Sequence, residues 1–116
     1  MEKPLLLDID VWSDVGLHES IDVEIDGVAQ DFAGWLEFEF VAGDLKAAQP
    51  LFSGAVQVVE RGKLFLAIEP AALAPLFTAN ESKVSKDYPY VLRVKPGTEY
   101  KIRLMYGKIT IHRGLP

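Results

Sequence analysis

The sequence contains no cysteine. A disulfide framework, a cysteine-ligated zinc site and a thiol nucleophile are therefore all excluded. Hydrophobic residues do not gather into long runs either. The run at residues 5–7 is far too short for a signal peptide, and no run approaches the length needed to span a bilayer. We therefore expect a protein that is made in the cytoplasm, without a signal peptide and without a membrane segment.

Side chains suited to catalysis are scarce. The two histidines are His18 and His112, and none of the serines lies in the strand–turn–helix pattern of a nucleophile elbow. Carboxylates recur at every second position in several segments, but alternation in a half-buried strand produces the same spacing. Calcium-binding loops instead crowd acids and a glycine into one irregular segment, and no phosphate-binding loop is present. The sequence predicts a non-enzymatic protein with no metal site and no cofactor.

The chain has 116 residues, of which 49% are hydrophobic and 25% charged, with a net charge of −5. These values predict one globular domain over residues 1–116. An acidic protein repels phosphate backbones, so we expect no nucleic acid as a partner. Basic residues concentrate in the last third of the sequence and acids in the first half. This asymmetry predicts either a dipolar molecule or simply solvated strand faces.

Alternation of apolar and acidic residues dominates the first part of the chain. It runs through residues 5–11, 21–25 and 36–40, and the last segment places Leu36, Phe38 and Phe40 on one face. A period of two is typical of a half-buried antiparallel strand. Residues 14–19, which include Gly16, are predicted to form a loop. The first strand is therefore a candidate edge strand that pairs with another subunit.

The middle of the chain predicts a hairpin followed by a helical turn. Residues 56–60 and 63–69 are the expected strands, and Arg61-Gly62 the tight turn between them. In the second strand, Leu64, Leu66 and Ile68 are expected to share one face. Residues 70–77 favour a short helix with Pro70 in its first turn. Residues 78–87 are polar and are predicted to form a loop.

A meander is expected at the C-terminal end. Residues 90–94 predict a strand with Tyr90, Leu92 and Val94 on one face, and Pro96-Gly97 a turn. Residues 100–106 predict a further strand, with one face formed by Tyr100, Ile102, Leu104 and Tyr106. A second turn is predicted at Gly107-Lys108, before a last strand at 109–111. Seven or eight strands at regular spacing predict an all-β, two-sheet antiparallel β-sandwich of the immunoglobulin-like type. A closed barrel is the main alternative.

One segment carries a family resemblance. Asp26-Gly27 ends a predicted strand, and Asp31-Phe32-Ala33-Gly34 precedes the next. This pattern resembles small virion proteins of tailed bacteriophages and prophages, in which Asp-Gly is followed by Asp-Leu-Thr-Gly. Phe32 and Ala33 replace the Leu and Thr of that tetrad. The looser similarity extends over about residues 18–113.

Three residues of the tetrad also have a physical reason for their positions. The Asp31 side chain suits an Asx-type turn, Phe32 an apolar plug beneath it, and Gly34 a positive φ. Together with Asp26 and Gly27 these residues are the predicted structural turn motif. The Thr hydroxyl of the phage pattern has no counterpart at Ala33.

The resemblance implies a structural connector in a phage virion, in the tail, neck, baseplate or fibre attachment. Its implied partners are other virion proteins and copies of itself around a symmetry axis. A carbohydrate- or ligand-binding module is the alternative, with Trp12, Trp35 or Tyr88 as stacking platforms. An acidic inhibitor that mimics nucleic acid is a further alternative. The candidate interaction residues are Leu5, Leu7, Trp12, Trp35 and Tyr88.

Overall fold

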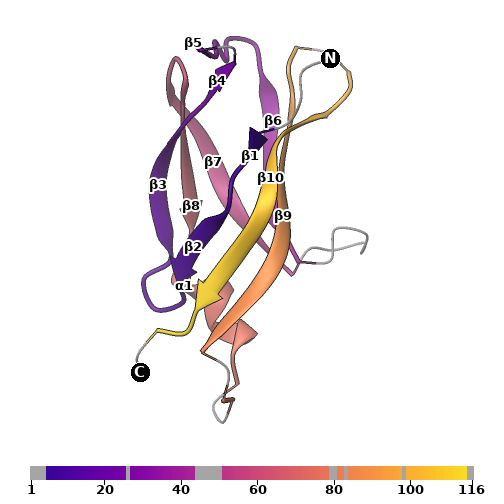
Figure 1. Ribbon diagram of the computed structural model, residues 1–116. Helices are drawn as coiled ribbons and strands as arrows, with labels where there is room; N and C mark the ends of the chain where they lie inside the picture. Colours follow the sequence, from indigo (N-terminus) through magenta and orange to yellow (C-terminus); the bar gives the residue numbers. More distant parts are fainter. Residues whose placement is uncertain are drawn as a thin grey trace.

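The computed structural model describes residues 5–25, 27–43, 51–78, 81–82, 84–97 and 99–114. Strands make up most of the described chain (Figure 1). The elements are β1 (Leu5–Leu6), β2 (Ile9–Trp12), β3 (Leu17–Asp22), β4 (Glu24–Ile25), β5 (Val28–Ala29), β6 (Leu36–Ala42), β7 (Phe52–Glu60), β8 (Lys63–Ile68), α1 (Pro70–Leu73), a 3-10 turn (Ala74–Leu76), β9 (Ser85–Lys95) and β10 (Ile102–His112).

An eight-stranded sheet forms the body of the molecule. Its order is β1-β10-β9-β6-β7-β8-β3, and β2 also pairs with β10. β1 and β2 run parallel to β10, whereas the other pairs of this sheet are antiparallel. The short β4–β5 pair is separate and lies at the end of the molecule opposite α1 (Figure 1).

The all-β prediction is confirmed, but the sheet does not divide clearly into the two sheets of a sandwich. It is a single mixed sheet curled into a half-barrel. Register shifts in β6 and β10 contribute to this shape, because a bulge bends its strand and increases the local twist. The sheet curls toward a closed barrel, which was the predicted alternative, but it does not close.

The concave side of the sheet holds the core. β8 follows the predicted alternation, with Leu64, Leu66 and Ile68 fully buried, and β9 contributes Leu92 and Val94. The expected hairpin turn at residues 61–62 and the expected helical turn at 70–77 are both present. Leu73 on α1 is fully buried within the same cluster, so the helical turn closes one end of the half-barrel.

The prediction for residues 36–40 is wrong at its first position. Leu36 is 64% exposed, although Phe40 is buried. Glu37 adopts a φ of +57°, and the pairing of β6 with β9 shifts between Leu36 and Glu39. The extra residue of a bulge reverses which side chains face the core, so Leu36 points to solvent.

The C-terminal prediction is also wrong in part. No turn interrupts the chain at Gly107-Lys108, because β10 runs unbroken through both residues. A register shift between Arg103 and Met105 buries both Leu104 and Met105, and it leaves Tyr106 on the other face, 41% exposed. The expected common face of Leu104 and Tyr106 therefore does not exist.

Two predicted loops are shorter than expected. β3 already begins at Leu17, and β9 begins at Ser85, so parts of the segments 14–19 and 78–87 are strand. Long cross-strand pairing outweighs the local polar composition at both places. β3 pairs with β8 over six residues, and the first residues of β9 pair with β10.

In the folded protein, acidic residues of β6 form ion pairs with basic residues from the last third of the sequence. Because β6 lies beside β9, Glu37 contacts Lys95 at 2.6 Å and Glu39 contacts Arg93 at 3.4 Å. Lys101 also contacts Glu39, at 3.2 Å. Acids of the first half thus meet bases of the last third, which favours the prediction of solvated strand faces over a dipolar molecule.

Candidate functional site

The curled sheet ends in two unpaired margins of different character. β3 is one margin, and β1 with β2 is the other; we call residues Leu5–Trp12 the N-terminal edge. A four-residue turn joins β2 to β3, and Trp12 forms a single bridge with Gly16 before the two strands diverge (Figure 1). Among the described residues no ladder joins them, so each margin keeps unpaired backbone groups.

Polar side chains occupy the β3 margin. His18, Glu19, Ser20 and Asp22 are all exposed. Glu19 lies opposite Leu66, on the face of the sheet that Leu17 and Leu64 share with the core. A charged side chain directed inward at a sheet margin is a known protection against edge-to-edge pairing. This margin is therefore poorly suited to strand addition.

The N-terminal edge is held to the barrel by a group of contacts around Leu7. The Tyr90 hydroxyl, inside the barrel, donates a hydrogen bond to the Leu7 carbonyl oxygen at 2.5 Å. A Cβ at Gly107 would overlap the same carbonyl, so only glycine leaves room for it. The Asp8 carboxylate accepts the backbone N–H of Lys108 at 3.1 Å. These contacts keep β1 and β2 in one register along β10.

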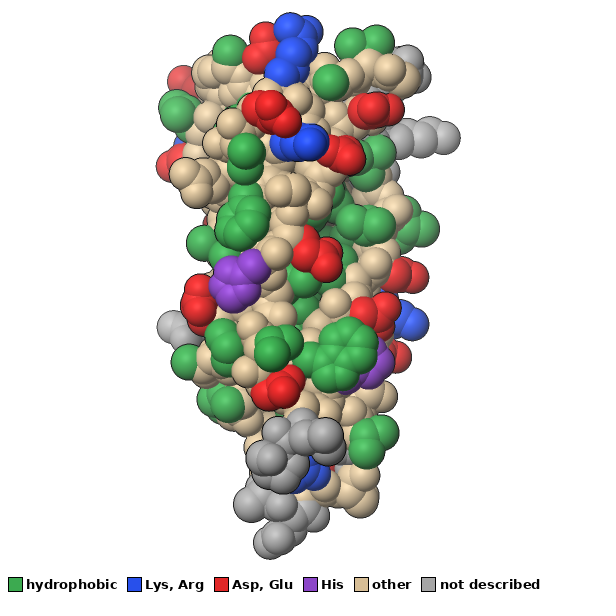
Figure 2. Space-filling view, turned by 90° about the vertical axis from the view of Figure 1, so that its left-hand side faces the viewer, with side chains coloured by type: hydrophobic (Ala, Val, Ile, Leu, Met, Phe, Trp, Pro, Cys, Tyr) green, Lys and Arg blue, Asp and Glu red, His purple; other side chains and the backbone are tan. Residues whose placement is uncertain are grey.

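Hydrophobic side chains are exposed along this edge. Leu6 is 67% exposed and lies beside Tyr106 in the β1–β10 ladder. Leu7, between the two strands of the edge, is also exposed. We call Leu6, Leu7 and Tyr106 the apolar patch. Figure 2 shows the side of the molecule that includes β3, where hydrophobic side chains reach the surface among acidic ones.

An aromatic pair occupies the far end of the same edge. Trp12 is 50% exposed, and its ring stacks on His112 at a centroid distance of 4.6 Å and an interplanar angle of 30°. His112 Nε2 lies 2.9 Å from Asp10 Oδ1, so the imidazole is fixed by both neighbours. Trp12 and His112 face each other in the β2–β10 ladder.

The predicted turn motif leads into β6, which pairs with β9 and not with the N-terminal edge. Asp26 is outside the described residues, and Gly27 has a φ of +80°. The Asp31 carboxylate accepts the backbone N–H of Ala33 at 3.0 Å, in the expected Asx-type turn. Gly34 has a φ of +79°, and Phe32 is buried beneath the turn.

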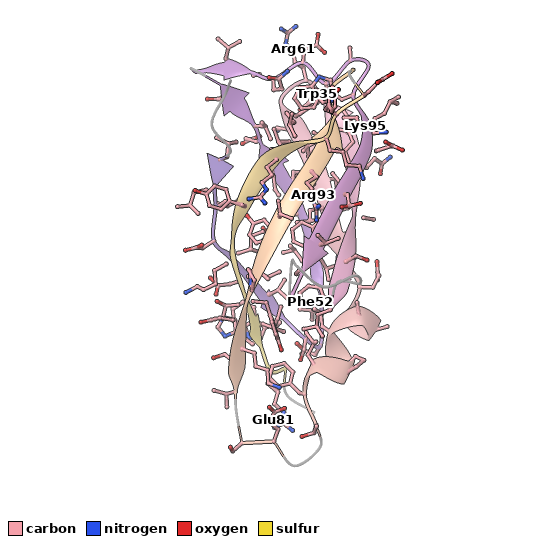
Figure 3. The ribbon with its side chains drawn as sticks, turned by 90° about the vertical axis from the view of Figure 1, so that its right-hand side faces the viewer. Trp35, Phe52, Arg61, Glu81, Arg93 and Lys95 are labelled. Atoms are coloured by element: carbon pink, nitrogen blue, oxygen red, sulfur yellow. The ribbon has the colours of Figure 1, made fainter. Side chains whose placement is uncertain are left out.

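Trp35 packs against Phe32 edge to face at 5.2 Å. Figure 3 shows Trp35 at the end of the molecule opposite Glu81. The motif thus has the Asx-type turn and the buried aromatic plug that the sequence predicts.

The other candidate interaction residues divide between core and surface. Leu5, Trp35 and Tyr88 are partly buried and pack against the core cluster, so they are not free platforms. Leu7 and Trp12 remain exposed. The structure brings Trp12 together with Asp10 and His112, and Leu7 with Leu6 and Tyr106. Sequence reasoning missed both groupings, because the parallel pairing of residues 5–12 with β10 has no local signal.

The described part of the chain contains no further candidate site built on a histidine or a metal ion, and no membrane-spanning helix. His18 bonds Glu69 at 3.3 Å, far along the sequence from the pair of His112 with Asp10. Within the described ranges, no group of three or more histidine, aspartate or glutamate side chains is placed to hold a metal ion. None of the helices described is long and apolar enough to cross a membrane.

Compared with known proteins, the sequence matches no protein-family model and no curated protein.

Proposed function

We propose that this protein is a non-enzymatic connector that acts through protein–protein contacts at the N-terminal edge. The difference between the two sheet margins carries the proposal. The β3 margin presents exposed polar side chains and an inward acid, whereas the N-terminal edge presents Leu6 and Leu7. An unpaired edge with exposed apolar side chains is the usual place for a partner strand to add.

The apolar patch supplies side chains suited to the centre of such a contact. Tyr106 combines a large apolar ring with a hydroxyl, a residue type enriched at the energetic centres of interfaces. Leu6 extends the patch onto β1, next to the unpaired backbone. The Tyr90–Leu7 hydrogen bond fixes the edge before binding, which lowers the entropy lost on association.

The resemblance around residues 25–35 supports a place in a phage virion, in the tail, neck, baseplate or fibre attachment. The partners are then other virion proteins and further copies of this chain around a symmetry axis. An immunoglobulin-like description of the fold belongs to this proposal as well. It is supported by the curling of the sheet, which sets β3–β8 opposite β9–β10 across the core (Figure 1).

Binding measurements with charge-introducing variants test the proposal. The mass of the purified protein is measured by light scattering, alone and with each neighbouring virion protein. Leu6→Asp and Tyr106→Asp are expected to weaken the complex at least about tenfold. Val59→Asp is the matched control, since Val59 is an exposed hydrophobic residue on β7 and the change in charge is the same.

A strict monomer that binds none of the virion proteins would contradict the connector proposal. Equal weakening by Val59→Asp and Leu6→Asp would contradict the assignment of the contact to the N-terminal edge.

A further inference from the structure

The aromatic pair at the end of the N-terminal edge has the composition of a ligand site. Two rows of side chains cross β2, β10 and β9 on the outer face. Trp12, His112 and Ser85 form one row, and Asp10, Thr110 and Asp87 form the next. We propose that these two rows bind a neutral saccharide, with Trp12 as the stacking platform. Asp10 and Trp12 belong to the N-terminal edge, but the inference uses none of the apolar patch, so it is tested separately from the connector function.

The platform is rigid and open on one side. His112 covers one face of the indole, and the ring nevertheless remains half exposed, so the opposite face is available. The apolar C–H face of a pyranose ring can stack there and remove indole surface from water. Because Asp10 holds His112 in place, little side-chain freedom is lost when the ring is covered.

Hydrogen-bonding groups lie next to the platform on β2, β10 and β9. Asp10 Oδ1 contacts His112, and the exposed carboxylate keeps acceptor capacity on its second oxygen. The Thr110 hydroxyl donates to Asp87 Oδ1 at 2.7 Å on the next strand. Ser85 and Asp87 also line an open depression at the beginning of β9.

The charges of these rows argue against other ligands. Asp10 contacts His112, and Asp87 accepts the hydroxyl of Thr110. Asp87 also lies 3.9 Å from Lys108. Neither carboxylate is therefore an isolated charge of the kind that binds a cation. The two carboxylates and the net charge of −5 disfavour nucleic acid. Charged groups are depleted from the centres of protein interfaces, but here they flank the single indole. A neutral polyol with one apolar face fits the remaining requirements.

The fluorescence of Trp12 gives a direct test. Trp35 is the second of two tryptophans, and Trp35→Phe keeps an aromatic ring against Phe32. In this background Trp12 is the sole indole. The protein is titrated with methyl glycosides of glucose, galactose, mannose, rhamnose and N-acetylglucosamine, and with linear oligosaccharides of each. We expect at least one saturable change with a dissociation constant on the order of 1 mM, typical of an open, shallow site.

Variants then assign the binding to the two rows. The affinity is measured by calorimetry for the best saccharide. Trp12→Ala is expected to lower it at least about tenfold and Asp10→Asn about threefold, since stacking contributes more than one hydrogen bond to water-exposed hydroxyls. Tyr106→Ala is the control, because Tyr106 is an exposed aromatic residue on β10, six residues before His112 on that strand. Circular dichroism checks that each variant is folded, and Asp10→Asn keeps the test valid if Trp12→Ala unfolds.

Two results would overturn the saccharide site. One is the absence of any binding across the panel up to about 10 mM. The other is binding that Trp12→Ala and Asp10→Asn leave unchanged. A failure of the connector proposal would be recognised separately, because Leu6→Asp and Tyr106→Asp change only the apolar patch.

Discussion

Tyr90 and Leu7 are 83 positions apart in sequence, yet a single hydrogen bond joins the phenol of one to the carbonyl oxygen of the other. Tyr90 is fully buried in the barrel and stacks on Phe40 at a centroid distance of 5.0 Å. Its hydroxyl therefore reaches the N-terminal edge from a rigid position. The candidate binding surface depends on this contact, because it holds residues 5–12 against β10.

Removing the Tyr90 hydroxyl is expected to destabilise the protein. Tyr90→Phe leaves the Leu7 carbonyl without its hydrogen-bond donor, at a cost of about 1–3 kcal/mol in the free energy of unfolding. Urea denaturation measures the difference. Tyr106→Phe also removes one phenolic hydroxyl, but from an exposed ring, and is expected to change the stability by less than about 0.5 kcal/mol. Equal effects of the two variants would contradict the role of the hydrogen bond.

Alkaline pH is expected to weaken the same contact. Burial, followed by the nearby Asp8 carboxylate, raises the pKa of Tyr90 above its ordinary value of 10. Because the folded state holds the phenol proton more tightly than the unfolded state, this contribution to stability is complete below pH 10 and is lost as the pH rises further. The loss approaches about 1.4 kcal/mol per pH unit for one proton.

The pH effect is read as the difference between wild type and Tyr90→Phe. Urea unfolding is measured for both proteins from pH 8 upward, and their stability difference should shrink above pH 10. A difference that stays constant over this range would show that the phenol of Tyr90 ionises as readily in the folded protein as in the unfolded chain.

Gly107→Ala is expected to displace the N-terminal edge. The added Cβ would overlap the Leu7 carbonyl oxygen, which is backbone and has no rotamer with which to move away. We expect a loss of about 1–3 kcal/mol, as for other overpacked sites. Hydrogen exchange measures where it occurs: amides of β2 should lose protection, whereas those of the β7–β8 hairpin serve as the internal control. Uniform loss across the sheet would contradict a local displacement.

The inward carboxylate of Glu19 is expected to keep the β3 margin from pairing. Glu19→Val should produce concentration-dependent association, because a sheet edge without an inward charge is a template for strand addition. Sedimentation velocity measures the association. Glu60→Val is the matched control, since it removes one carboxylate from the end of β7, next to the hairpin turn. If both variants remain monomeric, another feature protects this margin.

Strand periodicity was a reliable guide wherever the register was regular. β8 and the central part of β9 bury the alternate residues that the sequence predicts, and the turn at residues 61–62 lies where a glycine permits it. The predictions failed at β6 and β10, where bulges reverse the alternation. The bulge at Glu37, whose φ is +57°, lies where the pairing of β6 with β9 shifts, and such a shift leaves no periodic signal in the sequence.

Only single residues of the candidate site could be predicted from the sequence, and their grouping could not. Leu7 and Trp12 stood out as apolar residues in an edge strand, but Leu6, Tyr106, Asp10 and His112 did not. Trp35 and Tyr88 looked equally suitable as platforms, and both pack against the core instead. Which aromatic side chain faces water is decided by neighbours that are distant in the sequence.

The sequence by itself determined the all-β class, the positions of most strands and the local turn around Asp31, because each follows from a period of two or from the backbone preferences of a few adjacent residues. Only the tertiary structure decided that residues 5–12 run parallel to β10, which margin of the sheet is apolar, and that Trp12 meets His112. These features arise from pairing between segments about 100 residues apart, and the free energy of such pairing depends on the whole sheet rather than on local preference.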